Sequence, residues 1–164
     1  MSKKMIITFE GIEGSGKSLH IENVARHLKK NKINFIKLRE PGGSKNSEKI
    51  RKLILNNKSS FNRYTDLFLY LAARSENIEK IIDKHYKKKV ILIDRFTDST
   101  LAYQHYGMGI SKKIIEQLNN YLLKKIKVNF TILNIVNEKN LKKRLMFLLS
   151  KIFIKLFQKL EKNI

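Results

Sequence analysis

The sequence predicts an α/β fold in which a parallel β-sheet is flanked by helices. Short apolar runs rich in β-branched residues alternate with longer segments whose apolar residues recur every three or four positions. This alternation is typical of βαβ units, in which a helix connects two parallel strands. The runs expected to form about four strands are Met5–Phe9, Phe35–Leu38, Val90–Ile93 and Phe130–Val136.

Apolar residues at helical spacing between these runs predict the covering helices. These positions are Ile21, Val24, Ala25 and Leu28, then Leu67, Leu71, Ile78 and Ile82, then Ile114, Leu118 and Leu122. The sequence has no internal repeat and no linker rich in proline or glycine, and its single proline, Pro41, lies in a turn that contains glycine. We therefore expect residues 1–164 to form a single domain.

Composition excludes several classes of protein. The 164 residues include no cysteine, so neither a disulfide framework nor a thiolate metal site is possible. The net charge of +21 is spread through every segment rather than gathered on one stripe, which argues against a nucleic-acid partner. The first apolar run is too short for a signal sequence or a membrane span, so a cytoplasmic protein is the expectation.

The C-terminal segment differs from the rest of the chain. Apolar residues from Leu141 to Leu160 form one helical stripe, and lysines are frequent between them. We expect residues 146–164 to form a basic amphipathic helix. Such a helix can lie on a membrane, but packing on the sheet or on a partner subunit is the preferred interpretation, because core-facing helices commonly carry this stripe.

The most specific motif is Gly11-Ile12-Glu13-Gly14-Ser15-Gly16-Lys17-Ser18, which matches the pattern G-x-x-x-x-G-K-[ST]. Glycines let the backbone turn tightly around an anion, while amide N–H groups and the N-terminus of the following helix point at the phosphates. Lys17 is expected to reach the β- and γ-phosphate oxygens of ATP, and the Ser18 hydroxyl to ligate Mg²⁺. A predicted strand precedes the motif and a predicted helix follows it. The expected fold is therefore the three-layer sandwich of P-loop NTPases.

A carboxylate, Asp94, directly follows the predicted strand Val90–Ile93. In open α/β folds ligands bind where the strands end, so Asp94 is expected beside the phosphate loop. It is a candidate to hold Mg²⁺ through a water molecule, as a Walker-B carboxylate does.

Three further segments indicate the acceptor. Arg39-Glu40-Pro41-Gly42-Gly43 follows the second predicted strand, Leu71-Ala72-Ala73-Arg74 lies on the long helix, and the segment from Asp94 to Gln104 follows the third strand. The first resembles the R-E-P-G-G motif of bacterial thymidylate kinases, and the last resembles their D-R-Y-x-D-S-x-x-A-Y-Q motif. The resemblance runs from about Met5 to about Arg144. It implies an enzyme that transfers the γ-phosphoryl group of ATP to dTMP, giving dTDP and ADP, in dTTP biosynthesis.

The resemblance also implies roles for individual residues. In the family, arginines at the positions of Arg51 and Arg95 hold the monophosphate, and the arginine at the position of Arg74 contacts the thymine edge. Arginine suits these roles because its planar, permanently charged guanidinium binds phosphate or base oxygens with two N–H groups. Glu40 is expected in the turn that faces the monophosphate.

The base and sugar contacts are implied in the same way. The family stacks thymine on a phenylalanine four residues before the helix arginine. Here that position is Tyr70, for which simple packing in the core is the alternative. Ser99, Thr100 and Gln104 match positions that read the base. Tyr103 matches the residue packed against the sugar, where a 2′-hydroxyl would clash.

Phosphoryl transfer depends on positioning and charge neutralisation. We expect ATP and Mg²⁺ at the phosphate loop and dTMP at the arginines, with Lys17, Asp94 and Arg95 as catalytic residues. No general base is required, because the acceptor oxygen of dTMP is already ionised. The resemblance also implies a homodimer.

Family members whose phosphate loop has no arginine carry one on a later lid, and this phosphate loop has none. Arg144 matches the residue just before that lid, but no R-G-x-x-x-R-like sequence follows it. The last helices and strand of the family are also expected to be missing. The explanations for these missing parts, in order of preference, are truncation or a frameshift, a degraded gene copy, and replacement of the lid arginine by Lys151 or Lys155.

Two other functions stay open. A deoxyribonucleoside kinase also uses a phosphate loop and a D-R motif, but it needs a general base for a neutral hydroxyl. Arg51 and the R-E-P-G-G segment favour a charged monophosphate instead. A catalytically impaired remnant that binds dTMP or ATP without turnover is the second alternative, and the missing lid favours it. The sequence leaves open the selectivity between dTMP and dUMP and the oligomeric state.

Overall fold

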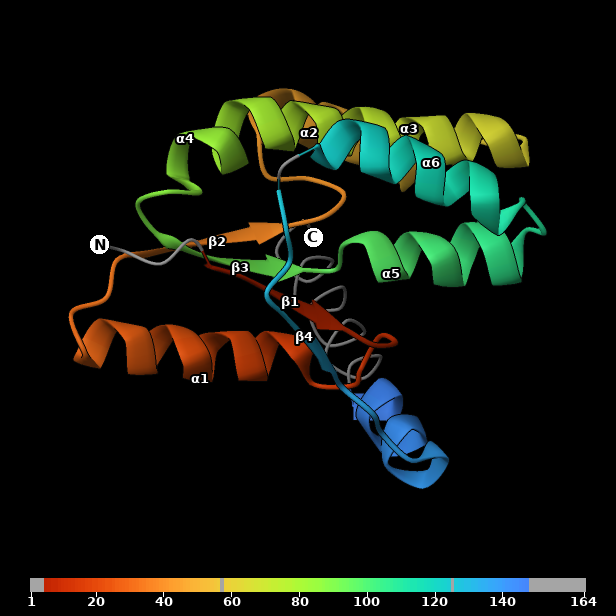
Figure 1. The fold of residues 1–164 in the computed structure, drawn as a ribbon. Helices are drawn as coiled ribbons and strands as arrows, with labels where there is room; N and C mark the ends of the chain where they lie inside the picture. The colour runs from red at the N-terminus through yellow and green to blue at the C-terminus, as the bar shows by residue number, and fades with distance from the viewer. Residues whose placement is uncertain (1–4, 57, 125, 148–164) are drawn as a thin grey trace, which may run out of the picture.

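The computed structural model describes residues 5–56, 58–124 and 126–147, whose arrangement is shown in Figure 1. Four parallel strands form one sheet in the spatial order β2-β3-β1-β4. The strands are β1 (Met5–Glu10), β2 (Phe35–Arg39), β3 (Val90–Asp94) and β4 (Phe130–Leu133). The predicted α/β fold with a parallel sheet is confirmed.

The fourth strand ends earlier than predicted, at Leu133 rather than at Val136. Its partner β1 ends at Glu10, where the chain turns into the glycine loop. The Asn134 N–H donates to the Glu10 carbonyl oxygen over 2.8 Å, and this is the end of the pairing between the two strands. The apolar run to Val136 was read as strand because composition cannot show where the partner strand stops.

Helices cover both faces of the sheet (Figure 1). α1 (Lys17–Lys30) lies on one face, and α3 (Arg63–Asn77) and α6 (Lys112–Leu123) lie on the other. The remaining helical elements are α2 (Lys45–Ile54), η1 (Ile78–Ile82), α4 (Asp83–His85), α5 (Thr97–Thr100) and η2 (Leu101–Gly107). Residues 138–147 are also helical. Most of the predicted basic C-terminal helix falls in residues 148–164, outside the described part of the chain.

Strand β3 is central and buried on both faces. Ile91 and Ile93 belong to an apolar cluster that includes residues of η1. Val90 and Leu92 belong to a second cluster, formed with α1. Because successive side chains of a strand point to opposite faces, a strand covered on both sides is apolar throughout. This central position explains the uninterrupted apolar run.

Side-chain caps fix the starts of the two helices that follow β2. Ser44 Oγ accepts a hydrogen bond from the Ser47 N–H at the start of α2. Asn62 Oδ1 accepts from the N–H groups of Tyr64 and Thr65 at the start of α3. Such caps satisfy N–H groups that have no partner within the helix, so they set where each helix begins.

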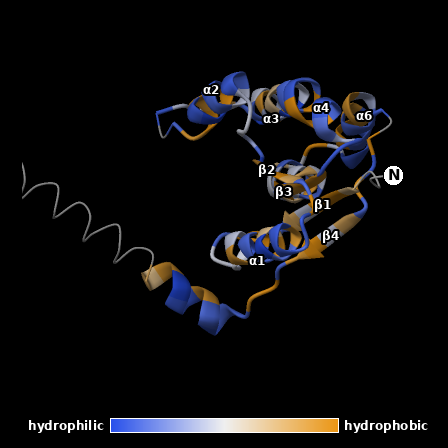
Figure 2. Cartoon of the chain, turned by 90° about the vertical axis from the view of Figure 1, so that its left-hand side faces the viewer, coloured by the Kyte–Doolittle hydropathy of each residue, from blue (hydrophilic) through white to orange (hydrophobic). Residues whose placement is uncertain are grey.

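Strand β4 forms one edge of the sheet, and all four of its residues are exposed. Apolar residues run along β1 and β4 in Figure 2, between α1 and the helices of the opposite face. Within the described residues, no helix is long and apolar enough to cross a membrane.

Candidate functional site

Glycines shape the loop between β1 and α1. Gly11 and Gly16 have φ angles of 135° and 96°. A Cβ on Gly11 would lie 2.5 Å from the Asn134 carbonyl oxygen, so only glycine fits there. Helix α1 begins at Lys17, directly after the loop, so its free N–H groups and the positive end of its dipole face the loop. The structure thus has the strand, glycine turn and helix that a phosphate loop needs.

Lys17 is folded onto this loop. Its Nζ donates to the carbonyl oxygens of Gly11 and Ile12 over 2.8 and 2.9 Å. Burial, followed by the nearby charge of Arg95, lowers the pKa of Lys17. An ammonium group has three N–H donors, so the two carbonyls leave one for a ligand.

Oxygen atoms suited to a metal ion lie beside the loop. Ser18 and Asp94 line the same cavity. Asp94 Oδ1 is buried and has no hydrogen-bond partner among the described residues. Mg²⁺ is commonly held by one or two protein oxygens together with phosphate oxygens and waters, so this donor set fits it. The described ranges contain no cluster of three or more His, Cys, Asp or Glu side chains that would form a metal site alone.

A cavity of about 690 Å³ brings the phosphate loop together with α2, α3 and the turns after β2 and β3. From the loop it is lined by Glu13, Gly14, Gly16, Lys17 and Ser18. From the predicted acceptor site and the end of β3 it is lined by Glu40, Arg51, Tyr70, Arg74, Asp94, Arg95, Ser99, Thr100 and Tyr103. Most of the predicted site residues therefore share one cavity.

Arg95 lies in the turn that follows β3. Its φ of 63° is uncommon for a residue other than glycine. Its backbone N–H donates to the Phe9 carbonyl oxygen over 3.0 Å. Its guanidinium carbon lies 5.5 Å from the centre of the Tyr103 ring, within cation–π range. Its Nη1 donates to Ser99 Oγ over 3.4 Å. These contacts hold a permanent positive charge at the cavity wall.

Arg51 reaches the cavity from α2. Its Nη1 donates to the Pro41 carbonyl oxygen over 2.6 Å, which ties α2 to the turn after β2. The guanidinium has five N–H donors in total, so it can bind an anion as well. The neighbouring Arg39 is instead paired with Glu48 at the surface and does not line the cavity.

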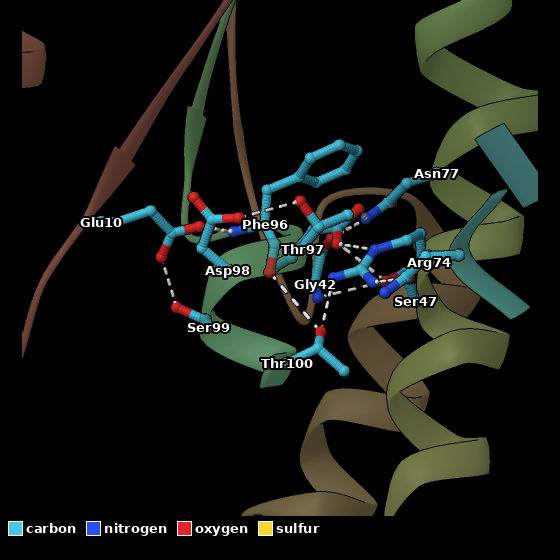
Figure 3. A network of polar contacts seen from close by, with 12 residues as sticks. Glu10, Gly42, Ser47, Arg74, Asn77, Phe96, Thr97, Asp98, Ser99 and Thr100 are labelled. Carbon is cyan, nitrogen blue, oxygen red and sulfur yellow. Dashed lines mark hydrogen bonds and ion pairs between the residues drawn. The ribbon is translucent and has the colours of Figure 1, made fainter. Parts of the chain in front are cut away.

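Arg74 is buried and held by polar side chains from the turn after β2, from α5 and from α6. Figure 3 shows its guanidinium beside Thr100. Its Nε donates to Glu40 Oε2 over 2.7 Å, and its Nη2 donates to Thr100 Oγ1 over 3.0 Å. Its Nη1 donates to Asn119 Oδ1. Burial raises the pKa of Glu40, while the charge and hydrogen bond of Arg74 act in the opposite direction. The guanidinium is thus fixed in one orientation at the cavity wall.

Two tyrosines line the cavity from different elements. Tyr70, on α3, is half-buried, and burial followed by the charge of Asp66 raises its pKa. Tyr103, on η2, is 46% exposed. Phe68, also on α3, is 56% exposed and is not a lining residue. The aromatic side chain that α3 presents to the cavity is therefore Tyr70.

Some predicted site residues do not line the cavity. Gln104 is buried, and its Nε2 donates to Asp66 Oδ2 over 2.9 Å. Within the phosphate loop, three predicted residues also do not line the cavity: Gly11, Ile12 and Ser15. Ile12 is 49% exposed, whereas Ser15 is buried. The side chains of these loop residues therefore do not shape the cavity.

Comparison with known proteins identifies the family. The family model described as thymidylate kinase matches residues 9–159. The chain belongs to the thymidylate kinase family. It is 42% identical over 118 residues to a thymidylate kinase of Kosmotoga olearia, with 71% of this chain and 57% of that protein covered. It is 41% identical over 121 residues to one of Acholeplasma laidlawii, with 73% and 60% covered. The chain thus spans less than two thirds of the length of these curated relatives.

A solved thymidylate kinase structure has the same fold. The crystal structure of thymidylate kinase from Ehrlichia chaffeensis matches with a TM-score of 0.75 and 35% sequence identity. The match covers 93% of this chain and 83% of that chain. It confirms the predicted three-layer α/β fold.

Three buried polar residues of this thymidylate kinase-family fold were not singled out from the sequence. Asn119 and Asn77 belong to the network around Arg74, where Asn77 Nδ2 donates to the Gly42 carbonyl oxygen over 2.6 Å. Neither asparagine could be recognised as a buried site residue from the sequence, because each lies within an amphipathic helix. Glu10 could have been found, since a carboxylate at the end of a predicted strand is the same signal that identified Asp94.

Proposed function

We propose that this chain is a thymidylate kinase, which transfers the γ-phosphoryl group of ATP to dTMP and gives dTDP and ADP. One observation carries the proposal: Lys17 of the phosphate loop lines the same cavity as Arg51 and Arg95. Transfer between two nucleotides needs a donor phosphate site and an acceptor phosphate site within one enclosure. Membership of the family and the names of the relatives support the assignment.

ATP is proposed to bind at the loop Gly11-Ile12-Glu13-Gly14-Ser15-Gly16-Lys17-Ser18. Backbone N–H groups of the loop and of the first turn of α1 would hold the phosphates. Lys17 would exchange its two loop carbonyls for the β- and γ-phosphate oxygens. Ser18 and Asp94 would hold Mg²⁺, which when bound neutralises part of the phosphate charge.

The monophosphate of dTMP is proposed to bind at Arg51 and Arg95. Guanidinium groups suit this role because they donate two parallel hydrogen bonds to phosphate. Tyr70 and Tyr103 line the cavity, and we propose that Tyr70 stacks on the thymine and that Tyr103 packs against the sugar. The half-buried position of Tyr70 in the cavity wall supports stacking over simple core packing.

Arg74 is proposed to bind the edge of the thymine. Glu40 and Thr100 hold its guanidinium, so they contribute to the acceptor site by orienting it. Ser99, which also lines the cavity, is proposed to complete the acceptor site. Gln104 is proposed to support the site through its hydrogen bond to Asp66 rather than by reading the base itself.

The chemistry that follows from this arrangement is positioning and charge neutralisation. The acceptor oxygen of dTMP is ionised at neutral pH, so no side chain has to remove a proton. Lys17 and Arg95 would neutralise the charges that otherwise keep two phosphates apart. Asp94, with Ser18, keeps oxygen ligands beside the loop. Lys17, Asp94 and Arg95 are therefore the proposed catalytic residues.

We also propose that residues 1–164 act as one domain, as a cytoplasmic homodimer that binds neither nucleic acid nor membranes. Family membership and the scattered distribution of lysines support this proposal. Sedimentation equilibrium checks the oligomeric state, and a monomer at micromolar concentration contradicts the dimer.

The kinase assignment is tested by mixing the purified chain with ATP, Mg²⁺ and dTMP and following ADP release. We expect dTMP-dependent turnover that falls about 100-fold or more in Lys17→Ala, because the positive charge at the donor phosphates is lost. A folded chain that binds dTMP without turnover contradicts the assignment and favours a binding remnant. ADP release with thymidine but not with dTMP favours a nucleoside kinase.

A further inference from the structure

Glu10 is a buried carboxylate that lies behind the cavity rather than in it. It is the last residue of β1, directly before the phosphate loop, and it is 4% exposed. It is not among the residues that line the cavity. Burial is the largest influence on Glu10 and raises its pKa. A buried carboxylate is costly to keep unless its hydrogen bonds are satisfied, so its contacts indicate what it does.

The carboxylate of Glu10 is bound to the start of α5 (Figure 3). Its Oε1 accepts from the Phe96 N–H over 2.7 Å, and its Oε2 accepts from the Ser99 hydroxyl. Both donors are neutral, and no ion pair to Glu10 occurs within residues 5–56, 58–124 and 126–147. The contacts of Glu10 therefore hold the turn that follows β3.

This turn carries Arg95, whose φ of 63° lies in the left-handed region. A non-glycine residue persists there only when the surrounding structure holds it. Strand β1 supplies that restraint on both sides of Arg95. The Arg95 N–H donates to the Phe9 carbonyl oxygen over 3.0 Å, and the next N–H, that of Phe96, donates to Glu10 over 2.7 Å.

Ser99 extends the restraint from the backbone to the guanidinium. The Ser99 hydroxyl donates its proton to Glu10 Oε2. The lone pairs of Ser99 Oγ are then left for the Arg95 Nη1, which lies 3.4 Å away. The hydrogen bond from Ser99 to Glu10 thus fixes the direction of the hydrogen bond between Ser99 and Arg95.

We propose that Glu10 is the positioning residue for Arg95: through Phe96 and Ser99 it orients the guanidinium toward the acceptor phosphate. The statement that Arg95 binds the monophosphate of dTMP rests on the proposed function. Because Glu10 also directly precedes Gly11, one residue links the start of the donor loop to the acceptor arginine.

The variants Glu10→Gln and Ser99→Ala test this role. The amide of Glu10→Gln can keep the bond to Phe96, but its NH₂ group donates to Ser99 and competes with Arg95 for the same lone pairs. Ser99→Ala leaves the Glu10–Phe96 bond intact and removes the hydroxyl that links Glu10 to the guanidinium and also lines the cavity. The matched control is Asp98→Asn, which makes the same carboxylate-to-amide change at an exposed position of α5, directly after this turn.

Hydrogen exchange without any ligand is the first measurement, and it does not depend on the proposed function. Glu10→Gln should speed the exchange of the amides of residues 95–100 while leaving that of α1 unchanged, and Asp98→Asn should change neither. Equal exchange in Glu10→Gln and wild type overturns the role of Glu10. If Glu10→Gln does not fold, the exchange of the amides of residues 95–100 in Ser99→Ala, measured without ligand, decides.

Kinetics with ATP and dTMP are the second measurement. Glu10→Gln and Ser99→Ala should raise KM for dTMP about tenfold, the effect of losing one charge-assisted contact, while KM for ATP stays within about twofold. An equal rise in both KM values, or the same rise in Asp98→Asn, shows a merely structural role and overturns the inference. A wild-type chain that does not use dTMP contradicts the proposed function, and the exchange data then decide the role of Glu10.

Discussion

Arg74 Nε lies 2.7 Å from Glu40 Oε2, and the side chains of both residues are almost completely buried. The pair joins α3 to the turn after β2. Removing charges from water is costly, and their attraction repays that cost only when both are present and hydrogen-bonded. Here the other two guanidinium nitrogens and the second carboxylate oxygen also have polar partners, so the pair is compensated as long as it is complete.

We therefore expect Glu40→Ala to lower the free energy of unfolding by about 3–5 kcal/mol, because it leaves the buried Arg74 charge without its carboxylate. Glu22→Ala is the control, since Glu22 pairs with Lys37 and both side chains are about half exposed. That change should cost less than about 1 kcal/mol. Urea unfolding followed by circular dichroism measures the free energy of unfolding of both variants. Similar losses in the two variants would contradict the conclusion that Glu40 compensates the buried charge of Arg74.

Gly43 lies in the same turn and should not tolerate a side chain. Its φ is +113°, and a Cβ there would lie 2.2 Å from Leu38 Cδ1 and 3.0 Å from Asn77 Oδ1. We expect Gly43→Ala to destabilise the protein by about 2–3 kcal/mol through backbone strain and the clash. At Gly107, the nearest atom to a Cβ is the Ala102 carbonyl oxygen at 3.7 Å, so Gly107→Ala should change stability by less than about 1 kcal/mol. Thermal melts of both variants check the contrast, and an unaffected Gly43→Ala contradicts it.

Local sequence patterns predicted the strands because each apolar run is bounded by residues that end it. The run predicted as Val90–Ile93 is observed as Val90–Asp94. The fourth strand was predicted too long because its end depends on where β1 stops, and that is a property of the partner strand. The π-helical turns of η2 were also outside the reach of the pattern, since they depend on how residues 101–107 pack.

The candidate site divides in the same way. The phosphate loop was predictable because the glycines of its motif indicate the positive φ angles that the loop needs. The bond between Arg74 and Glu40 was not, because it joins residues 34 positions apart in the sequence. Gln104 shows the converse: it matches a family motif by position, but in the structure its amide turns to Asp66 and away from the cavity lining.

The raised pKa of Glu10 predicts how stability depends on pH. Burial raises it above the ordinary value of 4.5, and the charge of Asp98 acts in the same direction, while the hydrogen bonds from Ser99 and Phe96 oppose it. In the window from pH 4.5 up to the raised pKa, the folded state therefore binds more protons than the unfolded state. The free energy of unfolding falls as the pH rises through that window.

Glu10→Gln lacks this titration. The stability of wild type relative to Glu10→Gln should therefore decrease as the pH rises from 4.5 to 7, and the difference should level off above the folded pKa. Urea unfolding of both proteins at half-unit pH intervals measures the difference. A difference that stays constant, or that grows with pH, shows that the pKa of Glu10 is not raised in the folded protein.

Arg144 lies beside the phosphate loop. Its Nη1 donates to the Gly14 carbonyl oxygen over 3.1 Å, and it lines the cavity from the helical residues 138–147. The phosphate loop itself contains no arginine. Arg144 therefore supplies the guanidinium that lines the cavity next to this loop. If ATP binds at the loop, this guanidinium lies beside the phosphates, where charge develops during transfer.

We therefore expect Arg144→Met to lower kcat by about 100-fold while KM for dTMP changes less than about threefold, since an interaction made mainly in the transition state is lost. Arg144→Lys should recover only part of the rate, because an ammonium cannot bind two oxygens in one plane. Lys143→Met, one exposed position away, removes the same charge without touching the cavity and should keep the wild-type kcat. Steady-state ADP release measures all three variants. Equal losses in Arg144→Met and Lys143→Met would show that the general basic charge of this segment matters rather than the contact of Arg144 with the loop.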